Sequence, residues 1–317
     1  MHPAFSVIVF TALSGAGYGL LFWAAFAALA GVSSARALLV ALAVALVLCS
    51  VGLLASLLHL GKPLRSWRAF SQWRTSWLSR EGVLAMLTYV PAVLLGVALL
   101  PGMLDGRASG AVPAFNAMGV AVALLLMACA LATVYCTAMI YASLTPIPAW
   151  RHRLVPPVYL GFSILTGGLL LAAISGSNGG IFGHIGAKVV IALALLLWLA
   201  KWRYWRDIAA PLPATRGAAV GLPQRMVSVF ERPHTEANYI TREMAFVVAR
   251  KHASQLRLIA VVLFAAMPVL CMLAALLSAD GGGRMWFALG AASAIAGTFV
   301  ERWLFFAEAR HLVTLYY

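Results

Sequence analysis

Apolar and polar residues alternate along this chain in long blocks. The apolar blocks lie at residues 5–30, 36–58, 82–103, 112–143, 157–175, 186–204, 256–279 and 285–307. Each is close to or above the roughly 20 residues that an α-helix needs to cross the hydrocarbon core of a membrane. The pattern predicts an all-α, polytopic membrane protein with eight transmembrane helices. No convincing internal repeat is present, so we expect one membrane-anchor domain over residues 1–317.

Only one of the connections between these blocks is long. Residues 205–255 are polar, of mixed charge, and contain Pro211, Pro213, Pro223 and Pro233. We expect an extramembrane segment there that is partly helical, with residues 236–255 continuing as a helix into the seventh span.

Composition supports a membrane protein. The chain is 63% hydrophobic and 10% charged, with a mean hydropathy of +0.94, whereas a soluble domain has about a quarter charged residues. A large soluble core is therefore excluded. His2 is the only ionisable side chain before the first apolar block. The chain therefore lacks the basic segment that opens a cleaved signal peptide, and none is expected.

The basic residues are distributed unequally between the two sides of the predicted bundle. Eight spans place both termini on one side, and that side receives 19 of the 23 Lys and Arg residues. The other side receives only Arg36, Arg107, Lys188 and Arg284. Cytoplasmic loops carry an excess of Lys and Arg, so the sequence predicts that both termini and the loop at residues 59–81 lie in the cytoplasm. This topology also explains the net charge of +14 without a nucleic-acid partner.

Cysteine and histidine positions argue against a metal or haem site within this chain. Cys49, Cys129, Cys136 and Cys271 fall inside apolar blocks, form no CxxC pair and are expected to be small core residues. A transmembrane haem needs buried axial ligands, usually paired histidines. The seven histidines all lie at predicted span ends or in loops, at positions 2, 59, 152, 184, 234, 252 and 311. We expect a haem-free and metal-free chain.

The loop at residues 59–82, HLGKPLRSWRAFSQWRTSWLSREG, concentrates unusual chemistry. His59 ends the second span and Glu81 opens the third, at the cytoplasmic membrane boundary. A histidine titrates near neutral pH and a carboxylate can relay a proton. A quinol loses two protons with its two electrons, and its polar ring lies at this depth. His59 and Glu81 are thus candidates for a proton-coupled quinone site.

Simpler interpretations of the same residues remain open. His59 could end a helix beside Gly61, and Glu81 could pair with a nearby arginine. The tryptophans of the loop could form an interfacial belt, and its basic residues could bind anionic lipid or an acidic partner. Tyr141 and Arg302 lie near the same membrane face; Arg302 could pair with Glu81 or with a quinone carbonyl, or simply snorkel.

Three segments resemble the DMSO reductase anchor-subunit family, the membrane subunits of three-part molybdoenzymes. His59, Leu60, Gly61, Pro63 and Arg65 match one family segment, and Glu81 after SWLSR matches another. MIYASLTPIPAW (139–150) resembles the end of the fourth helix, and GTFVERWLFF (297–306), with Arg302, resembles the closing helix. The likeness runs over all eight spans, although residues 205–255 are longer than in the best-known members.

The resemblance implies a role for the chain and for its site. The residues matching His59 and Glu81 are associated with menaquinol in that family, and we extend the expected quinone contacts to Arg65, Tyr141 and Arg302. The quinone would be ubiquinone or menaquinone. The anchor would dock an iron–sulfur subunit, which contacts a molybdopterin catalytic subunit, and would have no independent activity.

Topology distinguishes two branches of that family. DMSO reductase anchors carry the histidine loop on the periplasmic side, whereas here the loop lies on the basic, cytoplasmic side. This favours the branch that anchors a cytoplasmic sulfite dehydrogenase, which oxidises sulfite and reduces quinone, over a quinol-oxidising DMSO reductase type.

A secondary transporter is a different possibility, but it would place ionisable groups near the midplane, where this sequence has almost none. A purely structural anchor is the third.

Overall fold

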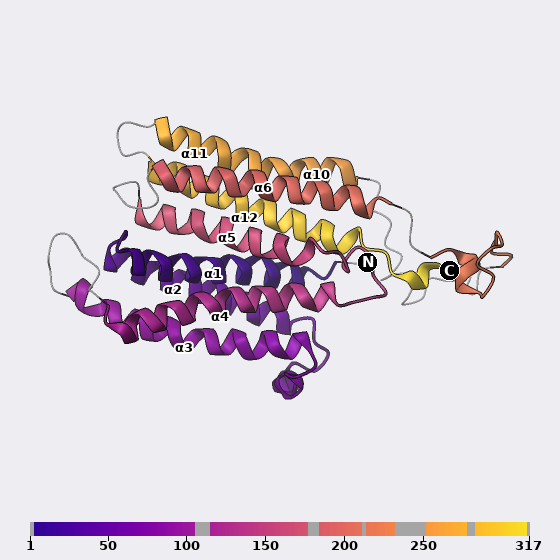
Figure 1. The fold of residues 1–317 in the computed structure, drawn as a ribbon, viewed down its shortest axis with the longest axis horizontal. Helices are drawn as coiled ribbons and strands as arrows, with labels where there is room; N and C mark the ends of the chain where they lie inside the picture. The colour runs from indigo at the N-terminus through magenta and orange to yellow at the C-terminus, as the bar shows by residue number, and fades with distance from the viewer. Residues whose placement is uncertain are drawn as a thin grey trace.

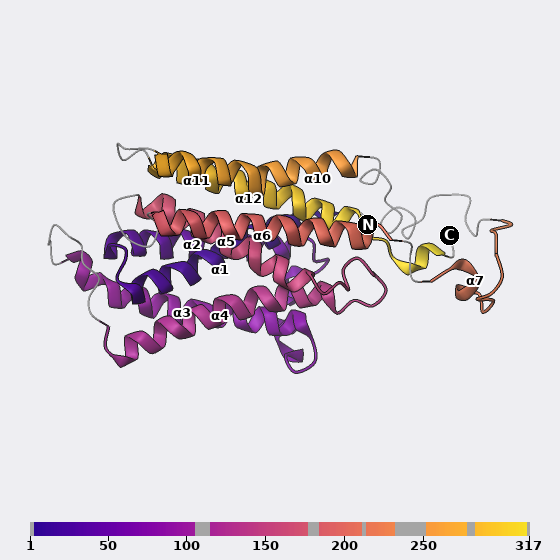
Figure 2. The same cartoon turned by 45° about the horizontal axis from the view of Figure 1, so that its top comes forward.

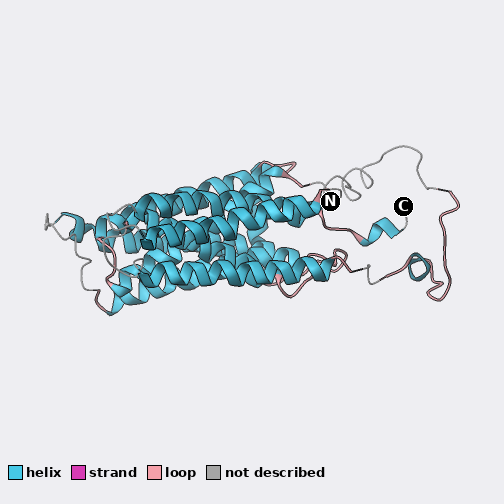
Figure 3. Cartoon of the chain, turned by 90° about the horizontal axis from the view of Figure 1, so that it is seen from above, coloured by secondary structure: helices cyan, strands magenta, loops and turns pink. Residues whose placement is uncertain are grey.

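The fold is a bundle of long helices. The computed structural model describes residues 3–104, 115–176, 184–210, 214–231, 252–277 and 283–315. Within those ranges the regular structure is entirely helical, with no strand (Figure 3). The long helices are α1 (Phe5–Ala30), α2 (Ala35–Leu57), α3 (Trp77–Leu104), α4 (Ala117–Ala142), α5 (Val155–Ser175), α6 (His184–Ile208), the continuous rod α10 (Ala253–Val261), η2 (Val262–Ala266) and α11 (Met267–Leu277), and α12 (Gly283–Ala307).

These helices correspond one to one with the predicted apolar blocks. Six of them, α1 to α5 and the α10–α11 rod, are long and apolar enough to cross a membrane. Helices α6 and α12 are of similar length, lie alongside them (Figures 1 and 2), and carry buried charges. The structure therefore confirms an all-helical, multi-pass membrane protein, while eight spans remain a prediction.

Short elements cap one end of the bundle. They are η1 (Pro63–Gln72), α7 (Arg216–Ala219) and η3 (Leu312–Leu315). Helix α1 begins at the same end, so both chain ends, η1 and α7 lie together there (Figure 1). The predicted helix over residues 236–255 lies mostly outside the described residues; α10 begins at Ala253.

Local sequence explains where several helices begin and end. The side-chain oxygen of Ser34 accepts a hydrogen bond from the Ala37 amide at the start of α2, and Asn116 does the same for Gly119 at the start of α4. Gly31, with φ of 63°, ends α1 in the left-handed conformation that a glycine adopts without strain.

The centre of the bundle is the crossing of α1 and α5, which are the most buried spans. A Cβ atom at Gly19 would overlap the backbone of Ser163, and one at Gly167 would overlap the backbone of Gly19 and Leu20. The two backbones are thus in direct contact. Small residues allow this approach, which supplies packing where lipid gives no hydrophobic drive between helices.

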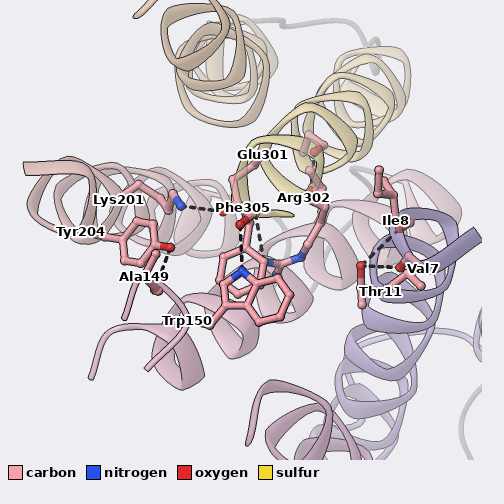
Figure 4. A network of polar contacts seen from close by, with 12 residues as sticks. Val7, Ile8, Thr11, Ala149, Trp150, Lys201, Tyr204, Glu301, Arg302 and Phe305 are labelled. Carbon is pink, nitrogen blue, oxygen red and sulfur yellow. Dashed lines mark hydrogen bonds and ion pairs between the residues drawn. The ribbon is translucent and has the colours of Figure 1, made fainter. Parts of the chain in front are cut away.

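A buried ion cluster connects α6 to α12. Lys201 Nζ lies 2.6 Å from Glu301 Oε1, and Arg302 Nη1 lies 2.9 Å from Glu301 Oε2 (Figure 4). The exposed fractions are 1% for Lys201, 0% for Glu301 and 1% for Arg302. Two cations and one carboxylate leave this cluster with a formal charge of +1. We call Lys201, Glu301 and Arg302 the ion cluster.

Breaking the ion cluster is expected to destabilise the bundle. Glu301→Gln removes the carboxylate that both cations contact, so two buried positive charges lose their partner. Removal of one member of a buried pair costs about 3–5 kcal/mol. We expect a clearly lower midpoint of thermal unfolding for the detergent-solubilised protein.

Asp207→Asn is the matched control. Asp207 also contacts two basic groups, Arg203 at 3.0 Å and His152 at 3.3 Å, but it lies near the end of α6 and is partly exposed. This change should leave the unfolding midpoint near that of the wild type. If Glu301→Gln and Asp207→Asn had equal midpoints of thermal unfolding, the buried ion cluster would not contribute more to stability than the partly exposed contacts of Asp207.

Candidate functional site

A cavity of about 800 Å³ opens at the end of the bundle that carries η1. We call it the end cavity. It is formed where α1 begins, α2 ends, α3 begins, and α4 and α12 end. Its lining includes Phe10, Leu54, His59, Lys62, Arg65, Phe70, Leu78, Glu81, Met86, Tyr141, Trp150 and Phe306. The cavity is therefore built from segments far apart in the sequence.

Helix η1 covers this cavity and is held in place by the first turns of α3. The Ser79 hydroxyl donates a hydrogen bond to the Ala69 carbonyl. The ring of Phe70 lies over Gly82, where a Cβ atom would come within 3.0 Å of it. Arg80 donates hydrogen bonds to the carbonyls of Trp73 and Arg74. Part of the polar loop sequence thus serves to fix η1 over the cavity.

His59 and Glu81 both line the end cavity but differ in exposure. His59 lies just after α2 and is exposed. Glu81 is 5% exposed, and its Oε1 accepts a hydrogen bond from Thr137 at 3.4 Å. The structure brings together the two residues that the sequence singled out, one at the rim and one inside.

The helix that carries Glu81 begins earlier than predicted. The apolar pattern placed the third span at residues 82–103, but α3 starts at Trp77. Its first turn contains the polar Ser79 and Arg80, whose side chains hold η1 and the turn after it. Glu81 therefore does not open the helix; it lies inside it and faces the bundle. No ion pair joins Glu81 to a Lys or Arg among the described residues, so pairing with a nearby arginine is not what holds it.

Arg65 and Tyr141 line the same cavity, as expected for contacts near a ligand. Arg65 is exposed and lies on η1, beside Lys62. Tyr141 is half-buried in an aromatic group, with its ring centroid 5.4 Å from that of Trp150 and 5.2 Å from that of Phe306. Neither Trp150 nor Phe306 was singled out from the sequence.

Arg302 lies apart from the end cavity, one layer deeper. It belongs to the ion cluster and stacks on the ring of Tyr159, with its guanidinium carbon 3.5 Å from the ring centroid. Of the alternatives left open by the sequence, pairing with Glu81 is not found: Arg302 pairs with the adjacent Glu301. Arg302 lines a second, small cavity instead, together with Tyr18, Thr137 and Tyr159. We call this the inner cavity.

The loop tryptophans are placed as an interfacial belt would be. Trp67 is 65% exposed and Trp73 is 54% exposed. Trp77 is more enclosed: its ring carries the Arg80 guanidinium at 4.4 Å and packs edge-on against Tyr135. Among the described residues, no group of three His, Cys, Asp or Glu side chains comes together as metal ligands would.

These features define a polytopic helical membrane protein with a ligand-sized cavity at one membrane surface. The family model of the DMSO reductase anchor subunit (DmsC) matches residues 1–307, and the chain belongs to that family. Over its full length the chain is 34% identical to the C subunit of sulfite dehydrogenase from Allochromatium vinosum, and the match covers 99% of that relative. The resemblance predicted from the sequence is confirmed, and the chain is the membrane anchor of a molybdoenzyme complex.

Proposed function

We propose that this chain is the quinone-reactive anchor of a three-subunit molybdopterin and iron–sulfur oxidoreductase in the bacterial cytoplasmic membrane. It passes electrons between an iron–sulfur subunit and the membrane quinone pool. In the favoured complex, the catalytic subunit oxidises sulfite to sulfate and the quinone is reduced. The anchor has no separate activity.

The observation that carries this proposal is the end cavity. Its volume of about 800 Å³ lies within the range of pockets that bind small molecules, which are mostly apolar with a few placed polar groups. Leu54, Leu78 and Met86 line it and are also exposed on the outside of the bundle. An isoprenoid tail could therefore reach the lipid while a polar ring lies beside His59, Arg65 and Glu81. The residues present fit ubiquinone or menaquinone.

A bound quinone supplies the two-electron, two-proton chemistry. His59, at the exposed rim, exchanges protons with water. Glu81, in the interior wall, holds a proton for one ring oxygen. Arg65 donates hydrogen bonds to a ring carbonyl, and the hydroxyl of Tyr141 orients the ring. The family resemblance supports a haem-free anchor, so a cluster in the iron–sulfur subunit would exchange electrons directly with this site.

Two observations favour sulfite as the substrate of the complex. The full-length relative is named as a subunit of sulfite dehydrogenase, and the basic residues favour a cytoplasmic position for the end cavity. The alternative is a quinol-oxidising complex of the DMSO reductase type, which the family description names. Family membership favours either anchor over a secondary transporter. Copurification of both partner subunits with bound quinone would test the proposal, and an isolated chain without quinone would contradict it.

The sulfite dehydrogenase type and the DMSO reductase type differ in the side of the membrane that the end cavity faces. Helix η1, α7 and both chain ends lie at one end of the bundle (Figure 1), so one measurement reports on all of them. We expect a cytoplasm-active reporter fused after Tyr317 to give signal, and a reporter active only in the periplasm to give none. A fusion after Arg36, which follows α1 at the opposite end, is the control and should behave in the opposite way. Reversed signals would favour the DMSO reductase type.

The same face offers a docking surface for the iron–sulfur subunit. Lys62, Arg65 and Arg68 lie exposed on and beside η1, next to the end cavity. An acidic rim on the partner would complement this charge and speed association. Docking there would also place a cluster close to the ligand in the end cavity.

A further inference from the structure

Behind the end cavity, the inner cavity contains buried polar groups without partners. Among the described residues, the hydroxyls of Tyr18 and Tyr159 and the Nε of Arg302 have no hydrogen-bond partner. All three residues line the inner cavity. A buried polar group left unsatisfied is costly, so three around one space indicate that something polar fills it.

The inner cavity is the size of one water molecule. Its volume is about 10 Å³, close to the lower limit for holding a single water. Thr11, Ser14 and Thr166 also line it, and their hydroxyls donate to carbonyls of their own helices. Their oxygens remain free to accept from a water, which in turn can accept from Arg302. A water here would have the two to four polar partners that a buried water needs.

Thr137 joins the two cavities. It lines the inner cavity, and its hydroxyl can donate to the Thr133 carbonyl, at 3.1 Å, or to Glu81 Oε1, at 3.4 Å. Glu81 itself lines the end cavity. A second connection is aromatic: Tyr141 of the end cavity stacks on Tyr159 at 6.0 Å, and the guanidinium of Arg302 lies over the Tyr159 ring. Glu81 therefore has the end cavity on one side and, through Thr137, the inner cavity that Arg302 also lines on the other.

The charges across this boundary are complementary. The ion cluster has a formal charge of +1, and Glu81 carries a negative charge once it gives up its proton. An opposite charge nearby and hydrogen bonds to the charged form both favour a carboxylate. Among the other titratable or charged groups, Tyr18, Cys136 and Tyr141 interact electrostatically with Glu81, and His59, Lys62 and Arg65 line the end cavity with it.

We propose that one water in the inner cavity links Arg302 to Thr137 and so stabilises the carboxylate of Glu81 after Glu81 has given up its proton. Arg302 is then a positioning residue and does not contact the quinone. In the direction of quinone reduction, two electrons come from the iron–sulfur subunit. The O–H bond of Glu81 breaks as its proton passes to one ring oxygen, and the other ring oxygen takes a proton from water through His59. The carboxylate later regains a proton from the cytoplasmic side through the end cavity. The inference rests on the proposed quinone site.

The experiment measures the protonation of Glu81 directly in the assembled complex. The infrared carboxyl band that disappears in Glu81→Gln is followed as pH is varied. Thr137→Val keeps the side-chain shape and removes the hydroxyl, and Arg302→Met leaves Glu301 paired with Lys201. Each should move the midpoint of this band up by about one pH unit, the effect of losing one hydrogen bond to a charged group. Arg302→Lys keeps the charge, so its midpoint should lie close to that of the wild type.

Thr133→Val is the matched control. Thr133 lies one turn before Thr137 on α4 and is also buried, but its hydroxyl bonds to the Cys129 carbonyl and lies 3.3 Å from the Thr88 hydroxyl, and it does not line the inner cavity. Its midpoint should equal that of the wild type. Unchanged midpoints in both Thr137→Val and Arg302→Met would overturn the inference, as would a high-resolution map of the complex with no density in the inner cavity.

The result also separates this inference from the proposed function. If Glu81→Gln slows quinone turnover but the Thr137 and Arg302 variants titrate like the wild type, the inner cavity has no role and the quinone site stands. If Glu81→Gln turns over quinone normally at every pH, the proposed proton donor is wrong, whatever the midpoints show.

Discussion

His59→Ala is expected to abolish quinone-linked electron transfer in the assembled complex. His59 lies at the exposed rim of the end cavity, where an imidazole can take a proton from water or return one. Loss of a positioned acid or base costs roughly 100- to 10,000-fold in rate. Because the side chain is exposed and lies outside the helices, its removal should not disturb folding. Activity of the catalytic subunit with an artificial dye should therefore persist.

His252→Ala is a suitable control for this change. His252 is also exposed and lies just before a helix, α10, but it does not line the end cavity. It should retain quinone turnover. Quinone reduction at the wild-type rate in His59→Ala would remove His59 from the site, and loss of dye activity in the same variant would point to an assembly defect.

The long helices could be predicted from the sequence because lipid imposes a simple rule. A spanning helix must satisfy its backbone internally and present apolar side chains over its length. Boundaries were less certain where polar residues belong to the helix. Ser79 and Arg80 were assigned to the loop, yet both belong to the first turn of α3, and their side chains donate hydrogen bonds to η1 and the turn that follows it.

The ion cluster was not predicted, although the sequence contains a signal for it. Lys201, Glu301 and Arg302 are charges within otherwise apolar helices, and such residues rarely lack a partner. What the sequence could not show is that residues 100 positions apart meet. From the sequence, pairing of Arg302 with Glu81 was one of several open possibilities, and pairing with the adjacent Glu301 was not considered, because adjacent residues on a helix do not face each other. The flexible side chain of Arg302 allows the shorter contact.

This cluster also refines the charge argument for sidedness. Lys201 and Arg302 were counted among the cytoplasmic basic residues, but both are buried and paired with Glu301. Their positions reflect contacts between helices more than the orientation of the chain in the membrane. The asymmetry then depends on exposed residues such as Lys62, Arg65 and Arg68, which belong to a short loop where the rule applies best.

The end cavity itself lay beyond sequence reasoning. Motif matches identified His59, Arg65 and Glu81, but the walls come from Phe10, Trp150 and Phe306, which read as ordinary apolar positions. Their convergence depends on how α1, α12 and the segment after α4 pack together. Sequence resemblance therefore indicated candidate site residues, and the fold was needed to show the cavity between them.

Glu81→Gln is expected to cause a large fall in quinone turnover with a smaller effect on inhibitor binding. Glutamine keeps the size of the side chain and can still accept a hydrogen bond from Thr137, so the cavity wall should stay intact. It cannot give or take a proton, and the loss of such a group costs roughly 100-fold or more. Turnover and inhibitor affinity should be measured on the same preparation.

Glu81→Asp retains an acid and should keep part of the activity, whereas Glu231→Gln, which changes an exposed carboxylate outside the bundle, should behave as wild type. Because no Lys or Arg pairs with Glu81 among the described residues, a lost ion pair would not account for the fall. Equal turnover of Glu81→Gln and wild type at every pH would leave Glu81 as a wall residue and assign proton transfer to His59 alone.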